Sequence, residues 1–174
     1  MNFVLAHPAT VGARFGEHLV LVAISLAIAL AIAFPLGVLA VRRPRIGSIV
    51  LGGLGAIYTI PSLALLAILV ELFGLGAPTA IVALVVYAQM ILVRNIAAGL
   101  AGVSPAALDA ADGLGFTRLQ RLVRIELPLA LPAILGGVRI ATVSLIAIAT
   151  VAAWIDAASR RFAIERPLLE REGA

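Results

Sequence analysis

The chain has 174 residues, of which 63% are hydrophobic and only 13% are charged, and its formal net charge is +4. Soluble globular proteins are about half apolar and about a quarter charged, so this composition predicts an integral membrane protein. The sequence has no Lys and no Cys, which excludes a P-loop lysine, a Schiff-base lysine, disulfides and Cys-ligated metals. With only His7 and His18 a His-rich metal site is not expected either, and we expect no catalytic residue, no metal site and no cofactor in this chain.

Four apolar stretches are long enough to be membrane spans, because about 20 apolar residues cross a hydrocarbon core of roughly 30 Å. They are residues 19–41, 46–75, 79–100 and 133–155. The first contains a row of small residues, Ala23, Ala27 and Ala31, that would let another helix approach closely, although alanine is also a generic helix former. The sequence therefore predicts an all-α integral membrane bundle with about four spans.

The second stretch is too long for one straight span, and it contains "YTIPS" (residues 58–62) in its middle. Pro61 removes a backbone donor, so we expect either one bent span or a span followed by a short half-helix. A broken helix at membrane depth is tolerated only where it is buried in protein or lines a cavity. Thr59, Pro61 and Ser62 are thus predicted to line a pathway through the membrane. The alternative is a packing kink in which Ser62 bonds back to its own helix.

Clusters of Arg orient the spans, because short cytoplasmic loops carry an excess of basic residues. Arg42, Arg43 and Arg45 follow the first span, and Arg118, Arg121 and Arg124 lie in a polar insert at residues 104–128. Both clusters are expected in the cytoplasm, which places the N-terminus outside the cell. Since the arginines follow membrane topology, we expect no nucleic-acid partner. Four more Arg in the polar tail, residues 158–174, contradict an external C-terminus.

The insert itself has the pattern of short helices with one apolar face. Gly113 and Gly115 can take positive φ and so allow a sharp turn between the helices. Pro128 and Pro132 are expected to end the element before the last span. The pattern predicts an ordered cytoplasmic element that another protein can grip. The alternative is an amphipathic helix lying on membrane lipid, with its arginines on phosphate groups.

The spacing in the insert resembles the "EAA" loop of ABC importer permeases. Its signature positions are Asp109-Ala110-Ala111, then Gly115 after three residues, Ile125 after nine more, and Leu127-Pro128 after one. Asp109 replaces the usual Glu, which keeps the charge and shortens the side chain by one methylene. In that family the loop forms a coupling helix that docks on a cytoplasmic ATPase. The resemblance therefore implies that these seven residues couple the chain to an ABC ATPase subunit.

Other segments resemble the osmoprotectant permeases of the same family. They are "TIPSLALLAIL" (59–69), "RNIAAGL" (94–100), "ELPLALPAILGGVRIATV" (126–143) and "IATVAAWIDA" (148–157). The resemblance implies a type I importer permease with a methionine-importer-like helix bundle in the bacterial inner membrane. It also implies glycine betaine, choline or carnitine as cargo. The implied partners are the ATPase, which would hold ATP and Mg, an extracytoplasmic solute-binding protein, and a second permease subunit in a homo- or heterodimer.

After Ala157 the resemblance ends, because the family continues with a glycine-rich turn and a further membrane helix. We expect a transmembrane domain at residues 1–157 with an atypical polar tail, explained by truncation or a frameshift. A truncated non-transporting remnant is therefore one alternative. A permease for another small solute, such as methionine, is a second. A secondary transporter is a third, but it would be expected to show inverted repeats and a paired intramembrane ion site, and neither is visible in the sequence.

A few isolated residues have two interpretations each. Arg139 lies inside the last span, where an ionisable group is a functional candidate, but it can also snorkel to the cytoplasmic interface. Tyr58, Tyr87 and Trp154 offer aromatic faces to a quaternary ammonium, although anchoring at the membrane interface is the commoner role of such residues.

Overall fold

The computed structural model describes the backbone of residues 8–172 and the side chains of residue 9 and residues 11–153. Within these residues the chain is helical and contains no strand. The elements are α2 (Pro8–Arg42), α3 (Pro44–Tyr58), α4 (Ser62–Phe73), α5 (Ala77–Ala101), α6 (Pro105–Gly113), α7 (Arg118–Arg121), a π-helix η1 (Leu122–Glu126) and α8 (Leu127–Glu172). This confirms the prediction of an all-α membrane protein.

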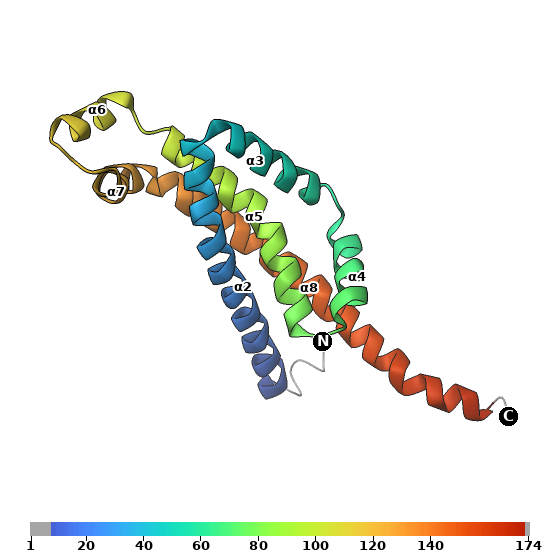
Figure 1. Ribbon diagram of the computed structural model, residues 1–174. Coiled ribbons are helices and arrows are strands. Elements are labelled where there is room, and N and C mark those ends of the chain that lie inside the picture. The colour runs from blue at the N-terminus through green and yellow to red at the C-terminus, as the bar shows by residue number, and fades with distance from the viewer. Residues whose placement is uncertain (1–7, 173–174) are drawn as a thin grey trace.

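Three helices in the described residues are long and apolar enough to cross a membrane, and a fourth crossing exists if the bent pair α3 and α4 counts as one span. Helix α5 lies at the centre, with α2 and α8 packed along it (Figure 1). Its side chains Leu84, Leu92, Val93 and Ile96 are at most 1% exposed, so α5 forms the core of the bundle. The small helices α6 and α7 lie together beyond one end of the bundle (Figure 1).

Helix α2 packs on α5 through small side chains. The buried row is Ser25, Ala29, Ala33 and Gly37, which are four residues apart and therefore share one face of the helix. A Cβ on Gly37 would lie 2.5 Å from Cγ2 of Ile96, so only glycine allows this approach. The predicted row of Ala23, Ala27 and Ala31 is exposed instead. It is offset by two residues from the buried row, about 200° around the helix, and thus faces away from the bundle.

The second apolar stretch is broken as expected. Helices α3 and α4 meet at 92°, and Pro61 is the N-cap of α4 with φ −55° and ψ 137°. The hydroxyl of Tyr87 donates a hydrogen bond to the carbonyl of Ile60 and so ties the break to α5. Since Tyr87 lies ten residues from Ala77, the break lies about 15 Å along α5, near the middle of that helix. Neither α3 nor α4 reaches the length of a full crossing alone.

The expected stop at Pro128 and Pro132 is wrong, because both residues lie inside α8. The N–H of Leu127 bonds to the carbonyl of Leu122, five residues back, so the helix is widened into a π turn just before Pro128. Pro128 has no N–H to donate within this continuous helix, and the π turn just before it accommodates the proline. The helix therefore continues from the loop into the membrane without a break.

Helix α8 is also longer than the predicted span at residues 133–155. Its backbone is helical on both sides of the expected boundary between residues 157 and 158, and Pro167 lies within it. The side chains of Trp154, Asp156 and the tail lie outside the described residues.

Candidate functional site: the polar loop and the helix break

The loop between α5 and α8 begins with a capped helix. The Ser104 hydroxyl accepts a hydrogen bond from the N–H of Ala107 at 3.3 Å, and Pro105 occupies the first helical position. Serine as N-cap followed by proline is a favoured start for a helix, because the proline needs no backbone partner there. Helix α6 is therefore defined by local sequence and does not depend on the bundle for its start.

A glycine turn ends α6. Gly115 has φ +77°, its N–H bonds to the carbonyl of Asp112 at 3.0 Å, and the N–H of Phe116 bonds to the carbonyl of Ala111 at 3.1 Å. This pair of hydrogen bonds with a left-handed residue is the Schellman motif, which favours glycine at that position. The predicted sharp turn is confirmed at Gly115. Gly113 has no positive φ and is the last residue of α6.

The chain then enters α7 through a capping box. Thr117 accepts a hydrogen bond from the N–H of Gln120 at 3.3 Å, and the Gln120 side chain accepts one from the N–H of Thr117 at 2.9 Å. The two residues satisfy each other's free backbone donors. Helix α7, only four residues long, thus has its start fixed by these reciprocal bonds.

The seven residues of the EAA-like signature divide into two groups. Asp109, Ala110, Gly115 and Pro128 are exposed, whereas Ala111 is buried and Ile125 and Leu127 are half-buried. Two leucines outside the signature, Leu114 and Leu119, are 75% and 70% exposed. The loop thus presents a mixed polar and apolar surface, and the buried members hold it together.

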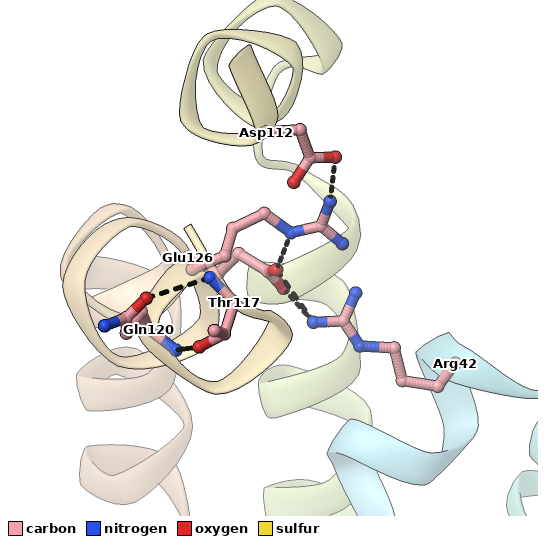
Figure 2. A network of polar contacts seen from close by, with 6 residues as sticks. Arg42, Asp112, Thr117, Gln120 and Glu126 are labelled. Carbon is pink, nitrogen blue, oxygen red and sulfur yellow. Dashed lines mark hydrogen bonds and ion pairs between the residues drawn. The ribbon is translucent and has the colours of Figure 1, made fainter. Parts of the chain in front are cut away.

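Four charged residues connect this loop to the first helix (Figure 2). Glu126 accepts hydrogen bonds from Nη2 of Arg42 at 2.7 and 2.9 Å and from Nε of Arg121 at 2.9 Å. Arg121 also donates from Nη1 to Asp112 at 2.6 Å. We call Arg42, Asp112, Arg121 and Glu126 the ion-pair network. It joins α6, α7 and η1 to the last turn of α2, which is far from them in sequence.

Glu126 is the centre of the ion-pair network and its most buried member. Its side chain is 4% exposed, against 16% for Arg121 and 36% for Arg42. A buried carboxylate is costly unless charged donors satisfy it, and here two guanidinium groups do so. Arg42 and Glu126 lie 84 residues apart, so sequence reasoning missed the pair. The one available signal was a Glu between apolar residues at the edge of a span.

The predicted pathway residues lie together at the break. Thr59 and Pro61 are exposed, and Ser62 begins α4 half-buried. The hydroxyl of Thr59, not that of Ser62, bonds back to its own helix, at the carbonyl of Ala56. Within the described residues no hydrogen bond reaches the carbonyls of Tyr58 and Thr59. Free carbonyls near the middle of a span require water or a ligand.

The two tyrosines of the bundle meet at the same break. Their ring centroids are 5.6 Å apart and the rings are inclined at 58°. Tyr87 is buried, whereas Tyr58 is 44% exposed and itself carries one of the two free carbonyls. The break therefore combines carbonyl dipoles with an aromatic face. Arg139 is exposed on α8 and makes no ion pair with any described residue.

Two more polar features lie between the helices. Gln89 is 6% exposed and donates to the carbonyl of Ala29 at 3.2 Å, while its Oε1 has no partner among the described residues. A cavity of about 750 Å³ opens between α2, α4, α5 and α8, lined mostly by apolar residues with Arg14, Glu17 and His18. Across the described residues no group of His, Cys, Asp and Glu is placed to hold a metal ion.

Known proteins resemble this chain over most of its length. Residues 25–165 match the family described as binding-protein-dependent transport system inner membrane component. The carnitine transport permease protein OpuCB of Listeria monocytogenes is 35% identical over 81% of this chain and 65% of its own length. The osmoprotectant import permease protein OsmW of Salmonella typhimurium is 40% identical over 81% of this chain and 68% of its own length.

A solved structure of the MetNI methionine ABC transporter in an inward-facing conformation has a TM-score of 0.68 with 22% identity, covering 80% of this chain and 71% of that chain. At this identity the likeness shows the fold alone, and it confirms the expected methionine-importer-like helix bundle. The chain spans a little under two thirds (65%) of the length of the Listeria carnitine permease. The family match includes the loop and both helices that flank it. The chain belongs to the family of inner membrane components of binding-protein-dependent transport systems.

Proposed function

We propose that this chain is a permease subunit of an ATP-driven importer for quaternary ammonium osmoprotectants. The family and the names of the relatives, which include carnitine and osmoprotectant permeases, support the class of cargo. The observation that carries the mechanism is the ordered loop at one end of the bundle, joined to the first helix through Glu126. Such a loop can transmit force, which is what a permease without covalent chemistry of its own needs.

The loop is the proposed docking surface for a cytoplasmic ATPase, which would hold ATP and Mg. Asp109, Ala110 and Gly115 are exposed on it, and Leu114 adds an apolar side chain that is 75% exposed. Ala111, Ile125, Leu127 and Pro128 would support the surface from behind and continue it into α8.

The break between α3 and α4 is the proposed pathway, with Thr59, Pro61 and Ser62 at its lining. A trimethylammonium group has no N–H to donate, so it interacts with carbonyl dipoles and aromatic faces. The free carbonyls of Tyr58 and Thr59 and the exposed ring of Tyr58 offer both within one turn of chain. A second permease subunit would close the other side of this pathway, and a solute-binding protein would deliver the cargo.

Uptake by the assembled transporter tests the cargo. The chain would be reconstituted in proteoliposomes with the ATPase, binding protein and any second permease encoded beside it. We expect ATP-dependent uptake of glycine betaine, choline or carnitine that stops when the binding protein is left out. Uptake of methionine in place of these compounds would assign the chain to another cargo. Absence of any binding-protein-dependent uptake would contradict the transport function.

A pair of exposed leucines at opposite ends of the bundle tests the docking surface. Leu114→Arg should prevent co-purification of the ATPase, because a charge would enter the apolar contact. Leu75→Arg is the matched control, since Leu75 is 51% exposed and lies in the turn before α5. If the ATPase co-purifies equally well with both variants, the docking surface is not the one assigned.

A further inference from the structure

We propose that Glu126 is a positioning residue that transmits movement of α6 to α2, and that the ion-pair network is the mechanical link between the ATPase and the first membrane helix. The inference rests on the proposed function, because it assigns a route for force that the ATPase would apply. It also makes a claim about the chain alone, which is that the distance between α6 and α2 depends on the charge of Glu126.

The Glu126 carboxylate lies between α2 and α7. Arg42 approaches Glu126 from the last turn of α2, and Arg121 approaches it from α7. Arg121 is in turn bonded to Asp112 near the end of α6. A displacement of α6 therefore pulls on Arg121 and, through Glu126, on Arg42. Because the Glu126 side chain is 4% exposed, solvent screens its two pairs only weakly, whereas the Arg121–Asp112 pair is more open to solvent because Asp112 is 55% exposed.

The local backbone allows this movement. Glu126 is the last residue of the π-helix η1, between α7 and α8. π-Helical segments are rare, and where they occur they are often found at functional sites. Helix α6 packs on α7 and η1, so force on α6 reaches η1 first. The carboxylate thus lies at the point where the loop can shift relative to the long helix α8.

From Arg42 the chain continues through α3 to the break between α3 and α4. Arg42 is followed by Arg43 alone before α3 begins at Pro44. Gly47 of α3 is buried, and a Cβ there would lie 2.9 Å from Cα of Ala40, so α3 packs tightly on the end of α2. Movement of Arg42 therefore carries α2 and α3 together. The other end of α3 is Tyr58, at the proposed pathway.

Two neutral substitutions and one control separate this role from simple stabilisation. Glu126→Gln removes the charge and keeps the size of the side chain, whereas Arg42→Gln removes the charge and also shortens the side chain. We expect each to lower the number of substrate molecules imported per ATP at least tenfold in the complete transporter, while the ATPase still binds and hydrolyses ATP. Arg45→Gln is the control, because Arg45 is exposed and makes no ion pair with any described residue. Arg45→Gln should leave the number of substrate molecules imported per ATP within about twofold of the value for the unsubstituted chain, as expected for an exposed charge that makes no ion pair.

The double variant tests whether the two residues act as one link. If they do, Glu126→Gln with Arg42→Gln should couple no worse than either single variant, because the interaction is already lost. If the loss of import per ATP in the double variant equals the product of the losses in the two single variants, the proposal is overturned. So would a Glu126→Gln transporter that imports as much substrate per ATP as the unsubstituted one. Loss of ATPase binding in Glu126→Gln would also overturn it, since the network would then only hold the docking surface.

A distance measurement decides the claim without any cargo. The chain has no Cys, so spin labels can be placed at Ala106→Cys in α6 and Leu39→Cys in α2, both exposed positions. Double electron–electron resonance should give a narrow distribution of distances between the two labels in the purified chain and a broader distribution after Glu126→Gln. An unchanged distribution would overturn the link even if transport is lost. Failure of the unsubstituted transporter to import anything would count against the proposed function and leave this measurement valid.

Discussion

Two adjacent glycines of α8 give a direct test of how α8 packs on α5. Gly137 is buried, and a Cβ added to it would collide with Cβ of Asn95 and lie 2.9 Å from its Cγ. Gly136 is exposed, and a Cβ added there would meet no described atom within 4 Å. We therefore expect Gly137→Ala to be less stable than Gly136→Ala, which adds a Cβ without a collision.

The size of the difference follows from two opposing effects. Exchange of a helical Gly for Ala gains about 1 kcal/mol of helix propensity at either position. Overpacking of a tight contact costs about 1–3 kcal/mol when the neighbour cannot move away. Asn95 is held in place, because its Nδ2 donates to the carbonyl of Ile91 at 2.8 Å, and its Cβ moves only with the α5 backbone. Since the propensity gain is common to both variants, Gly137→Ala should be less stable than Gly136→Ala by about 1–3 kcal/mol.

The free energy of unfolding can be compared by SDS titration of each purified variant in detergent micelles, followed by circular dichroism. A third variant, Asn95→Gly with Gly137→Ala, moves the Cβ from one helix to the other and should recover part of the loss. If Gly137→Ala and Gly136→Ala unfold at the same SDS fraction, the close approach of α5 and α8 at this point is refuted.

The loop and the helix break give three more expectations. Gly115→Val should abolish uptake without preventing membrane insertion, because a β-branched residue is strained at φ +77°; uptake equal to that of a Gly113→Ala control would contradict this. Thr117→Ala should weaken the start of α7 by about 1 kcal/mol, seen as faster amide exchange at Gln120, and unchanged exchange would count against the capping box. Tyr87→Phe should lower the free energy of unfolding by about 1 kcal/mol, through loss of its bond to the Ile60 carbonyl, and equal stability would refute that bond.

Features set by local sequence were the ones that could be predicted. The membrane helices follow from apolar length, and Pro61 located the break because a proline removes a backbone donor wherever the chain folds. The turn at Gly115 followed from the left-handed φ that glycine readily adopts. The loop as a coupling element came from the spacing of the signature, and it stays a prediction until docking is measured.

Features set by tertiary contact could not be predicted. The Arg42–Glu126 pair depends on how α2 and η1 meet, and 84 residues separate the partners. The choice between the Ala23 row and the Ser25 row is a rotation of α2 about its axis, and both rows consist of small residues that suit a close contact. Pro128 was expected to stop the helix because the π turn that accommodates it leaves no mark in composition.

Because α2 and α3 meet at a tight corner, the two helices would turn together as one rigid bent unit. Helix α3 has 15 residues and is about 22 Å long at about 1.5 Å per residue. A rotation of this unit by about 10° about the corner would then carry Tyr58 through an arc of about 4 Å, from the same length estimate. That displacement is about three quarters of the pitch of an α-helix, which is about 5.4 Å, so a small rotation at the corner would move the end of α3 at the break by several ångströms. The amplification depends on the stiffness of this corner, and a larger residue at Gly47 would force α3 away from the backbone of Ala40 and so loosen it.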